Sequence, residues 1–209
     1  MSDATWSNLH KVYGKQDWIN KPSLFADTAR QYFPKTGKLL DLGAGVGQDS
    51  IYFSTLGYDV TATDLDITKL KSNVADKNAT LTLGQVDLRG PMAFTDGEFD
   101  IVYAHLSLHY FDQQTTESIF SEIYRVLKPG GILAFFTNST NDPEYNTGKE
   151  IEPDYFEIDG VPKRYLSVES ARAFAHNFKV LLADNNGETF KDAAVGVHNL
   201  IRFIGEKAE

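Results

Sequence analysis

The chain has no cysteine among its 209 residues. That absence excludes a disulfide framework, a catalytic thiolate and any cysteine-based metal site. The five histidines do not form the zinc pattern H-E-x-x-H, so we expect no protein-bound metal. The pattern G-x-S-x-G is also missing, which argues against a hydrolase triad of the usual kind.

Long apolar runs and basic clusters are missing as well. No stretch is long enough to cross a bilayer, and the first residues are polar without a signal-peptide core. We therefore expect a cytoplasmic protein with no membrane partner. The formal net charge of −9 argues against nucleic acid as a partner, because a phosphate backbone demands a basic surface.

The most informative feature present is a set of alternating glycines that follows an acid. The apolar segment 38–42 reads as a strand and carries Asp41; Gly43, Gly45 and Gly47 come next, and the sequence then turns helical. Glycines here let the backbone take angles closed to other residues and let a ligand lie against the main chain. The arrangement predicts a nucleotide-type cofactor site.

A second acid supports this interpretation. Asp64 ends the strand predicted at 59–63, about 20 residues after the glycines, where an acid reaches a ribose diol in such folds. An acid at this place can also be a simple turn former. We favour the ribose role because the glycines precede it.

The spacing of the glycines indicates which cofactor is bound. A nicotinamide-binding turn reads G-x-G-x-x-G and faces a pyrophosphate. Here the spacing is G-x-G-x-G, and Gln48 stands where the third glycine of that pattern belongs. Asp41 would repel a pyrophosphate but suits a cationic ligand such as S-adenosylmethionine, which carries a sulfonium and an ammonium.

At this point the sequence resembles the class I S-adenosylmethionine-dependent methyltransferases. The likeness continues in family order through 83–88, 99–110 and 127–131, so it covers about 38–137. The segment after the fourth strand is closest to small-molecule methyltransferases of the tellurite-resistance group. The resemblance implies an α/β fold: a doubly wound, mostly parallel, seven-stranded, Rossmann-like sheet with an antiparallel last strand. It implies S-adenosylmethionine contacts from Asp41, Gly43, Ala44, Gly45, Asp64, Leu65, Asp87, Leu88, Ala104 and His105.

We expect a single domain with four parts. Residues 1–37 form an N-terminal helical cap and 38–137 form the cofactor-binding core. Residues 138–166, rich in polar residues and without a clear period, read as a lid-like loop. Residues 167–209 supply a helix and a strand pair. The expected helices are 22–33, 46–56, 67–76, 115–127 and 167–177, and the expected strands are 38–42, 59–63, 80–86, 100–104, 132–137, 178–184 and 199–205.

The acceptor side is predicted from aromatic and histidine residues. His109 follows the fourth strand and is our prediction for a general base, since an imidazole is a usable base at neutral pH. Packing at a helix start is the alternative for His109. Tyr110, Tyr13 and Trp18 are predicted to shape an acceptor pocket, although each could serve packing alone.

We therefore predict a methyltransferase that uses S-adenosylmethionine on a small-molecule acceptor and acts as a monomer or homodimer. Two alternatives stay open. A non-catalytic S-adenosylmethionine-binding regulatory or scaffold protein would keep the same cofactor residues. A nicotinamide-dependent oxidoreductase is disfavoured by Asp41 and Gln48. The sequence does not identify the accepting atom.

Overall fold

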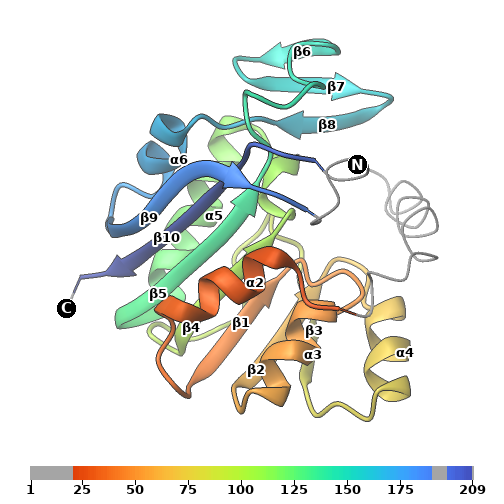
Figure 1. The fold of residues 1–209 in the computed structure, drawn as a ribbon, viewed down its shortest axis with the longest axis vertical. Coiled ribbons are helices and arrows are strands. Elements are labelled where there is room, and N and C mark those ends of the chain that lie inside the picture. Colours follow the sequence, from red (N-terminus) through yellow and green to blue (C-terminus); the bar gives the residue numbers. More distant parts are fainter. Residues whose placement is uncertain (1–20, 190–196, 209) are drawn as a thin grey trace.

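A twisted sheet of seven strands organises the molecule (Figure 1). The computed structural model describes residues 21–189 and 197–208. The strand order is β3-β2-β1-β4-β5-β10-β9, and β10 runs antiparallel to both of its neighbours. The predicted sheet, with its antiparallel last strand, is confirmed. Its strands are β1 (Lys38–Leu42), β2 (Asp59–Asp64), β3 (Thr82–Gln85), β4 (Phe99–His105), β5 (Leu127–Thr137), β9 (Phe178–Gly187) and β10 (Leu200–Lys207).

Helices cover both faces of this sheet, because successive strand residues point to opposite sides. Leu40 and Val102 belong to the core that includes α5 and α6, whereas Leu39 and Ile101 belong to the core that includes α2, α3 and α4. The helices are α2 (Leu24–Ala29), α3 (Gln48–Thr55), α4 (Thr68–Asp76), α5 (Gln113–Val126) and α6 (Val168–Phe174), with short 3-10 turns η2 (Arg30–Tyr32) and η3 (Leu108–Tyr110).

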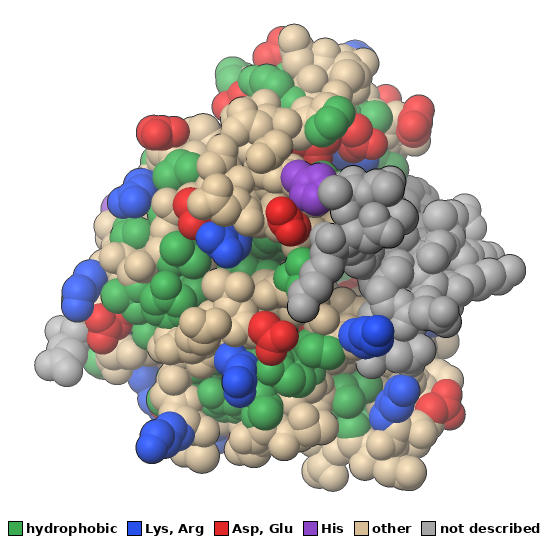
Figure 2. Space-filling view, viewed as in Figure 1, with side chains coloured by type: hydrophobic (Ala, Val, Ile, Leu, Met, Phe, Trp, Pro, Cys, Tyr) green, Lys and Arg blue, Asp and Glu red, His purple; other side chains and the backbone are tan. Residues whose placement is uncertain are grey.

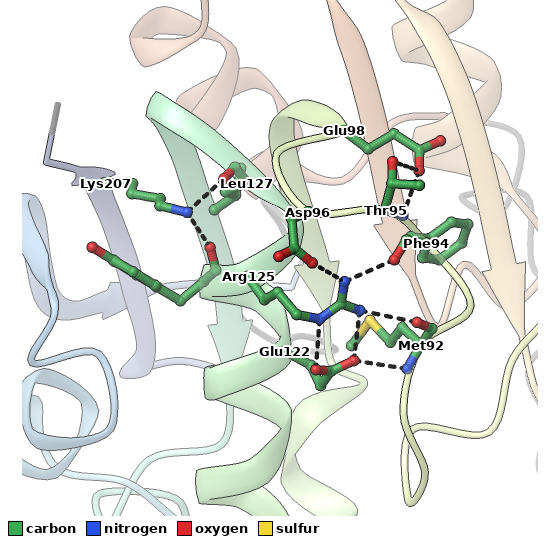
Figure 3. Close-up of polar contacts among 10 residues, drawn as sticks. Met92, Phe94, Thr95, Asp96, Glu98, Glu122, Arg125, Leu127 and Lys207 are labelled. Atoms are coloured by element: carbon green, nitrogen blue, oxygen red, sulfur yellow. Dashed lines mark hydrogen bonds and ion pairs between the residues drawn. The ribbon is translucent and has the colours of Figure 1, made fainter.

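Two cations fix the C-terminal part of α5 (Figure 3). Arg125 extends from α5 to the loop before β4, where it donates to the carbonyl oxygens of Phe94 (2.8 Å) and Met92 (3.0 Å) and pairs with Asp96. Lys207 of β10 donates to the carbonyl oxygen of Leu127 at 2.7 Å. These contacts are structural and lie outside the predicted cofactor site.

Residues 138–166 differ from the expected irregular loop. They contain a three-stranded antiparallel sheet of β6 (Lys149–Glu152), β7 (Tyr155–Ile158) and β8 (Val161–Arg164), which lies beyond the arrowhead of β5 in Figure 1. Asp159 and Gly160 both have positive φ, as a tight two-residue hairpin turn requires. Acidic side chains gather over this region in Figure 2, and Glu150 and Glu157 are exposed there.

A smaller difference concerns the start of β5. The strand was expected to start at Ile132, after a helix ending at Leu127. Instead, pairing with β4 begins at Leu127 opposite Phe99 and resumes at Ile132 opposite Ile101. The residues between them form an irregularity in the strand, where Gly130 has a φ of 73°.

Candidate cofactor site and acceptor side

The glycine turn connects β1 to α3, and all three glycines have positive φ: 74° at Gly43, 60° at Gly45 and 81° at Gly47. A Cβ on Gly43 would come within 2.3 Å of the Cβ of Ser107, and one on Gly47 within 2.4 Å of Leu70 Cδ1. Among the described residues, none lies within 4 Å of a Cβ placed on Gly45. The outer two glycines therefore serve packing, and the turn is open to a ligand at Gly45.

Strand β2 holds this turn in place. The amides of Gly43 and Ala44 both donate to the carbonyl oxygen of Thr63, at 2.9 and 2.8 Å. The amide of Gly45 donates to Asp64 Oδ2 at 2.8 Å, and Asp64 Oδ1 accepts from the amide of Asp66. The structure thus brings Asp64 against the glycines, as the spacing predicted. It adds Ser107, which donates from its hydroxyl to the carbonyl oxygen of Leu42 at 2.5 Å.

Asp41 is a buried carboxyl group beneath the turn. Its side chain is 2% exposed, and Oδ2 accepts a hydrogen bond from Ser50 Oγ at 2.5 Å. Burial raises the pKa of Asp41 to about 8; the Ser50 bond opposes this, and the charges of Asp49 and Asp64 add to it. A cation placed nearby would stabilise the ionised form. This arrangement fits a positively charged ligand.

The adenine-side residues follow β3. The amide of Val86 donates to the carbonyl oxygen of Asp64 at 3.0 Å, so this segment starts alongside the ribose-side acid. Asp87 pairs with Arg89, which lowers the pKa of the Asp87 carboxyl. Leu88 is partly buried against the core.

His105 ends β4 after the fully buried Ala104. Its ring stacks on Phe136, with centroids 5.0 Å apart and planes 5° from parallel. Burial lowers the pKa of His105, so the ring is neutral near pH 7. Within the part of the chain that the structure describes, His105 Nε2 is buried and has no hydrogen-bond partner. A ligand or a water is the natural source of one.

His109 lies in η3 and is 5% exposed, with its ring centroid 4.0 Å from that of Tyr110. Burial, assisted by the charge of Lys163 and by His105, lowers the pKa of His109 to about 3. Nδ1 is buried and lacks a partner among the described residues. His109 is therefore neutral near pH 7 but a weak base. It borders a small cavity lined by Leu108, Thr116, Phe120, Phe135, Thr137, Arg164 and Leu166.

The three-stranded sheet β6–β8 rests on the segment that follows His109. Tyr155 Oη donates to the carbonyl oxygen of Tyr110 at 3.0 Å. Arg164, 3% exposed, donates from Nε to the carbonyl oxygen of Phe111 at 3.0 Å and forms an ion pair with Glu152. The sheet is thus anchored next to the predicted acceptor side.

Comparison with known proteins identifies the family. Residues 40–135 match the family described as methyltransferase domain. This match and the relatives described below support a class I S-adenosylmethionine-dependent methyltransferase. The matched residues include the glycine turn, Asp64, Asp87 and His109. The cofactor predicted from the glycine turn, S-adenosylmethionine, is confirmed as the one this family uses.

Two curated relatives show the extent of the likeness. The chain is 37% identical over 98 residues to an uncharacterized methyltransferase of Synechocystis sp., covering 46% of this chain and 45% of that protein. It is 32% identical over 135 residues to a malonyl-[acyl-carrier protein] O-methyltransferase of Enterobacter lignolyticus, covering 64% of this chain and 52% of that one. The alignments thus span about half the length of these relatives.

A solved structure shares the fold of this methyltransferase. It is that of 1,6-didemethyltoxoflavin-N1-methyltransferase from Burkholderia thailandensis, with bound 1,6-didemethyltoxoflavin and S-adenosylhomocysteine. The TM-score is 0.73 at 16% identity, covering 99% of this chain and 85% of that one.

Two residues that were predicted to shape the acceptor pocket, Tyr13 and Trp18, lie outside the described residues. Across 21–189 and 197–208, no group of three or more His, Asp or Glu is placed to hold a metal ion. Over the same ranges no helix has the length and apolar character needed to span a membrane. Three buried residues next to the site were not predicted from the sequence: Ser23, Asp49 and Tyr103.

Proposed function

We propose that this methyltransferase transfers the methyl group of S-adenosylmethionine to a small-molecule acceptor. The observation that carries the proposal is the glycine turn, which is open at Gly45 and has the buried Asp41 carboxyl beneath it. In its ionised form the Asp41 carboxylate would attract a cationic cofactor and repel an anionic one. A sulfonium cofactor also needs little chemistry from the protein beyond orientation and exclusion of water.

The cofactor residues have separate roles in this proposal. The backbone of Gly43, Ala44 and Gly45 holds the methionine end, and Asp41 balances its charge. Asp64 accepts hydrogen bonds from the ribose diol beside Leu65.

The remaining cofactor residues hold the other end of the ligand. Asp87 accepts from the adenine amino group in competition with Arg89, which donates to both oxygens of the Asp87 carboxylate. Leu88 packs on the adenine ring, and Ala104 and His105 form the wall near the methyl group. The unpartnered Nε2 of His105 supports that last placement.

The acceptor side consists of His109, Tyr110 and the covering sheet β6–β8. The relatives support a small acceptor, since one is named for malonyl-[acyl-carrier protein] and the structural neighbour for 1,6-didemethyltoxoflavin. We propose that residues 138–166 act as a lid which holds the acceptor and keeps water out. The tellurite-resistance likeness stays a prediction, as does the assignment of Tyr13 and Trp18.

His109 is proposed to contact the acceptor and to take its proton where one must leave. Its pKa of about 3 keeps the imidazole unprotonated at neutral pH, with an acceptor lone pair available. The same pKa makes it a weak base, so it suits acceptors whose proton becomes strongly acidic during transfer.

The test is S-adenosylhomocysteine production, followed by mass spectrometry over a panel of carboxylic acids, phenols, amines and thiols. The proposal predicts turnover with at least one class. It also predicts that His109→Ala lowers the turnover number by about 10²-fold or more while the cofactor dissociation constant changes little. His176→Ala is the matched control, since His176 is exposed at the end of α6. Cofactor binding without turnover on any acceptor would favour the non-catalytic binding module.

A further inference from the structure

Asp49 is a carboxylate buried in the core and held by neutral donors. Its side chain is 4% exposed. It accepts from the amide of Ser23 at 2.7 Å, from Ser23 Oγ at 2.8 Å and from Tyr103 Oη at 2.7 Å. These donors come from the residue before α2 and from the middle of β4. One side chain therefore joins three separate elements.

The position of Asp49 relates this contact to the glycine turn. Asp49 is the second residue of α3, and α3 begins directly after Gly47. Gly47 provides no side-chain cap for the helix. The next residue, Ser50, donates to Asp41 in β1. The first turn of α3, and with it the end of the glycine turn, is therefore fixed by these two carboxylates.

Ser23 has a second role at the start of α2. Its Oγ accepts from the amide of Ala26 at 3.0 Å and so caps the helix, while the same hydroxyl donates to Asp49. If α2 moved away, Asp49 would lose two of the three donors that the described residues give it. Leaving a buried carboxylate short of partners is costly. Docking of α2 and order in the first turn of α3 therefore depend on each other.

The hydroxyl of Tyr103 keeps its proton and so remains a hydrogen-bond donor to Asp49. Burial, followed by the charge of Asp49, raises the pKa of the Tyr103 hydroxyl well above its ordinary value. The hydroxyl stays protonated and donates to Asp49 at any physiological pH. Asp49 therefore accepts one hydrogen bond from Tyr103 of β4, and it accepts two more from Ser23 when α2 is docked.

We propose that Asp49 is a positioning residue that couples cofactor occupancy of the glycine turn to the docking of helix α2. This rests on the proposed function for the identity of the ligand. Because coupling between two sites is reciprocal, a ligand that orders the turn must also stabilise α2. Weakening the hold of Ser23 or Tyr103 on Asp49 must in turn weaken cofactor binding. Asp49 itself touches no reacting atom in this account.

The experiment is hydrogen exchange by mass spectrometry on the full chain, with and without S-adenosylhomocysteine, together with calorimetric titration. In the wild type, the ligand should slow exchange both in 24–29 and in 48–51. In Tyr103→Phe and Ser23→Ala, which each remove one of the donors to Asp49, the slowing of 24–29 should shrink, and the dissociation constant should rise about fivefold or more. A positioning role alone predicts this ligand-dependent change in α2, because a merely structural residue would shift exchange equally with and without ligand.

Tyr58→Phe is the matched control. The rings of Tyr58 and Tyr103 both pack edge-on against Phe53, and Tyr58 Oη donates to the carbonyl oxygen of Pro34 rather than to Asp49. This variant should lose some stability but keep the wild-type ligand response. Equal responses of α2 in Tyr103→Phe and the wild type would overturn the coupling, while wild-type binding of the ligand would leave the proposed function in place. Failure of the wild type to bind S-adenosylhomocysteine would overturn both.

Discussion

At the scale of single residues, Asp64 has two tasks in this account. It braces the glycine turn through the amide of Gly45, and we propose that it binds the ribose diol. Asp64→Ala should raise the cofactor dissociation constant at least about tenfold, since each hydrogen bond to a charged group contributes about 1.5–3 kcal/mol. Isothermal titration calorimetry would measure the change.

A matched control for this variant lies on the same strand. Asp59→Ala removes an exposed acid at the opposite end of β2 and should leave the dissociation constant unchanged. Asp64→Asn keeps one acceptor for the Gly45 amide and should fall between the wild type and Asp64→Ala. Unchanged affinity in Asp64→Ala would remove the ribose assignment.

The buried carboxyl of Asp41 predicts a pH dependence of stability. Its folded pKa of about 8 lies above the ordinary value of 3.8, so between these values the folded chain binds more protons than the unfolded chain. The free energy of unfolding contributed by Asp41 is therefore fully present below about pH 4 and is lost as pH rises towards about 8.

Urea unfolding of the wild type and Asp41→Asn measures this effect. Relative to the variant, the wild type should lose stability between about pH 5 and about pH 8, by at most about 1.4 kcal/mol for each pH unit. The exposed Asp59→Ala variant should track the wild type across this range. Parallel curves for Asp41→Asn and the wild type would show that the pKa of Asp41 is not raised.

How much of the site the sequence predicts depends on how local each signal is. Asp41, the glycines and Asp64 stand out because strand ends and turns leave a short-range pattern. Asp49 and Tyr103 are 54 positions apart, and the register of two parallel strands and a helix must be known before their contact is visible. Burial of His109 likewise depends on the tertiary fold. It lowers the pKa of His109 to about 3, whereas the sequence prediction of a general base assumed an ordinary imidazole pKa.

At the scale of elements, the three-stranded sheet was missed although the sequence contains a signal for it. Asp159-Gly160 between the apolar Ile158 and Val161 is a typical hairpin turn. The strands themselves are only four residues long and carry mixed charges, so their periodicity is weak. The long α5 and the strand β4 before it, in contrast, have strong periodic patterns and were predicted to within about two residues.

Arg164 should be the anchor of the covering sheet. Arg164→Leu removes its bond to the Phe111 carbonyl and its ion pair with Glu152. We expect a loss of at least about 1.5 kcal/mol in the free energy of unfolding, together with faster proteolytic cleavage within 138–166. Arg172→Leu, at an exposed position on α6, is the control and should change neither quantity. Wild-type proteolysis of Arg164→Leu would show that other contacts hold the sheet.

At the scale of the whole molecule, the sheet order and the antiparallel β10 agree with the prediction because topology is strongly constrained. Alternating strands and helices with right-handed crossovers leave few arrangements, and the family pattern selects one. The ends of β1, β2 and β4 then meet at one edge, which is where a ligand binds in such sheets. The fold does not determine the acceptor, because the side chains that contact the acceptor lie outside the sheet and helices that the family shares.

The most direct test of the central claim is thermal unfolding with excess S-adenosylhomocysteine, compared with NADH. Ligand at 100 times its dissociation constant adds about 2.7 kcal/mol to the folded state, worth about 5–10 °C for a chain of this size. We predict that shift with S-adenosylhomocysteine and none with NADH, and we expect Asp64→Ala to reduce it. A shift with NADH alone, or with neither ligand, would contradict the assignment of the glycine turn.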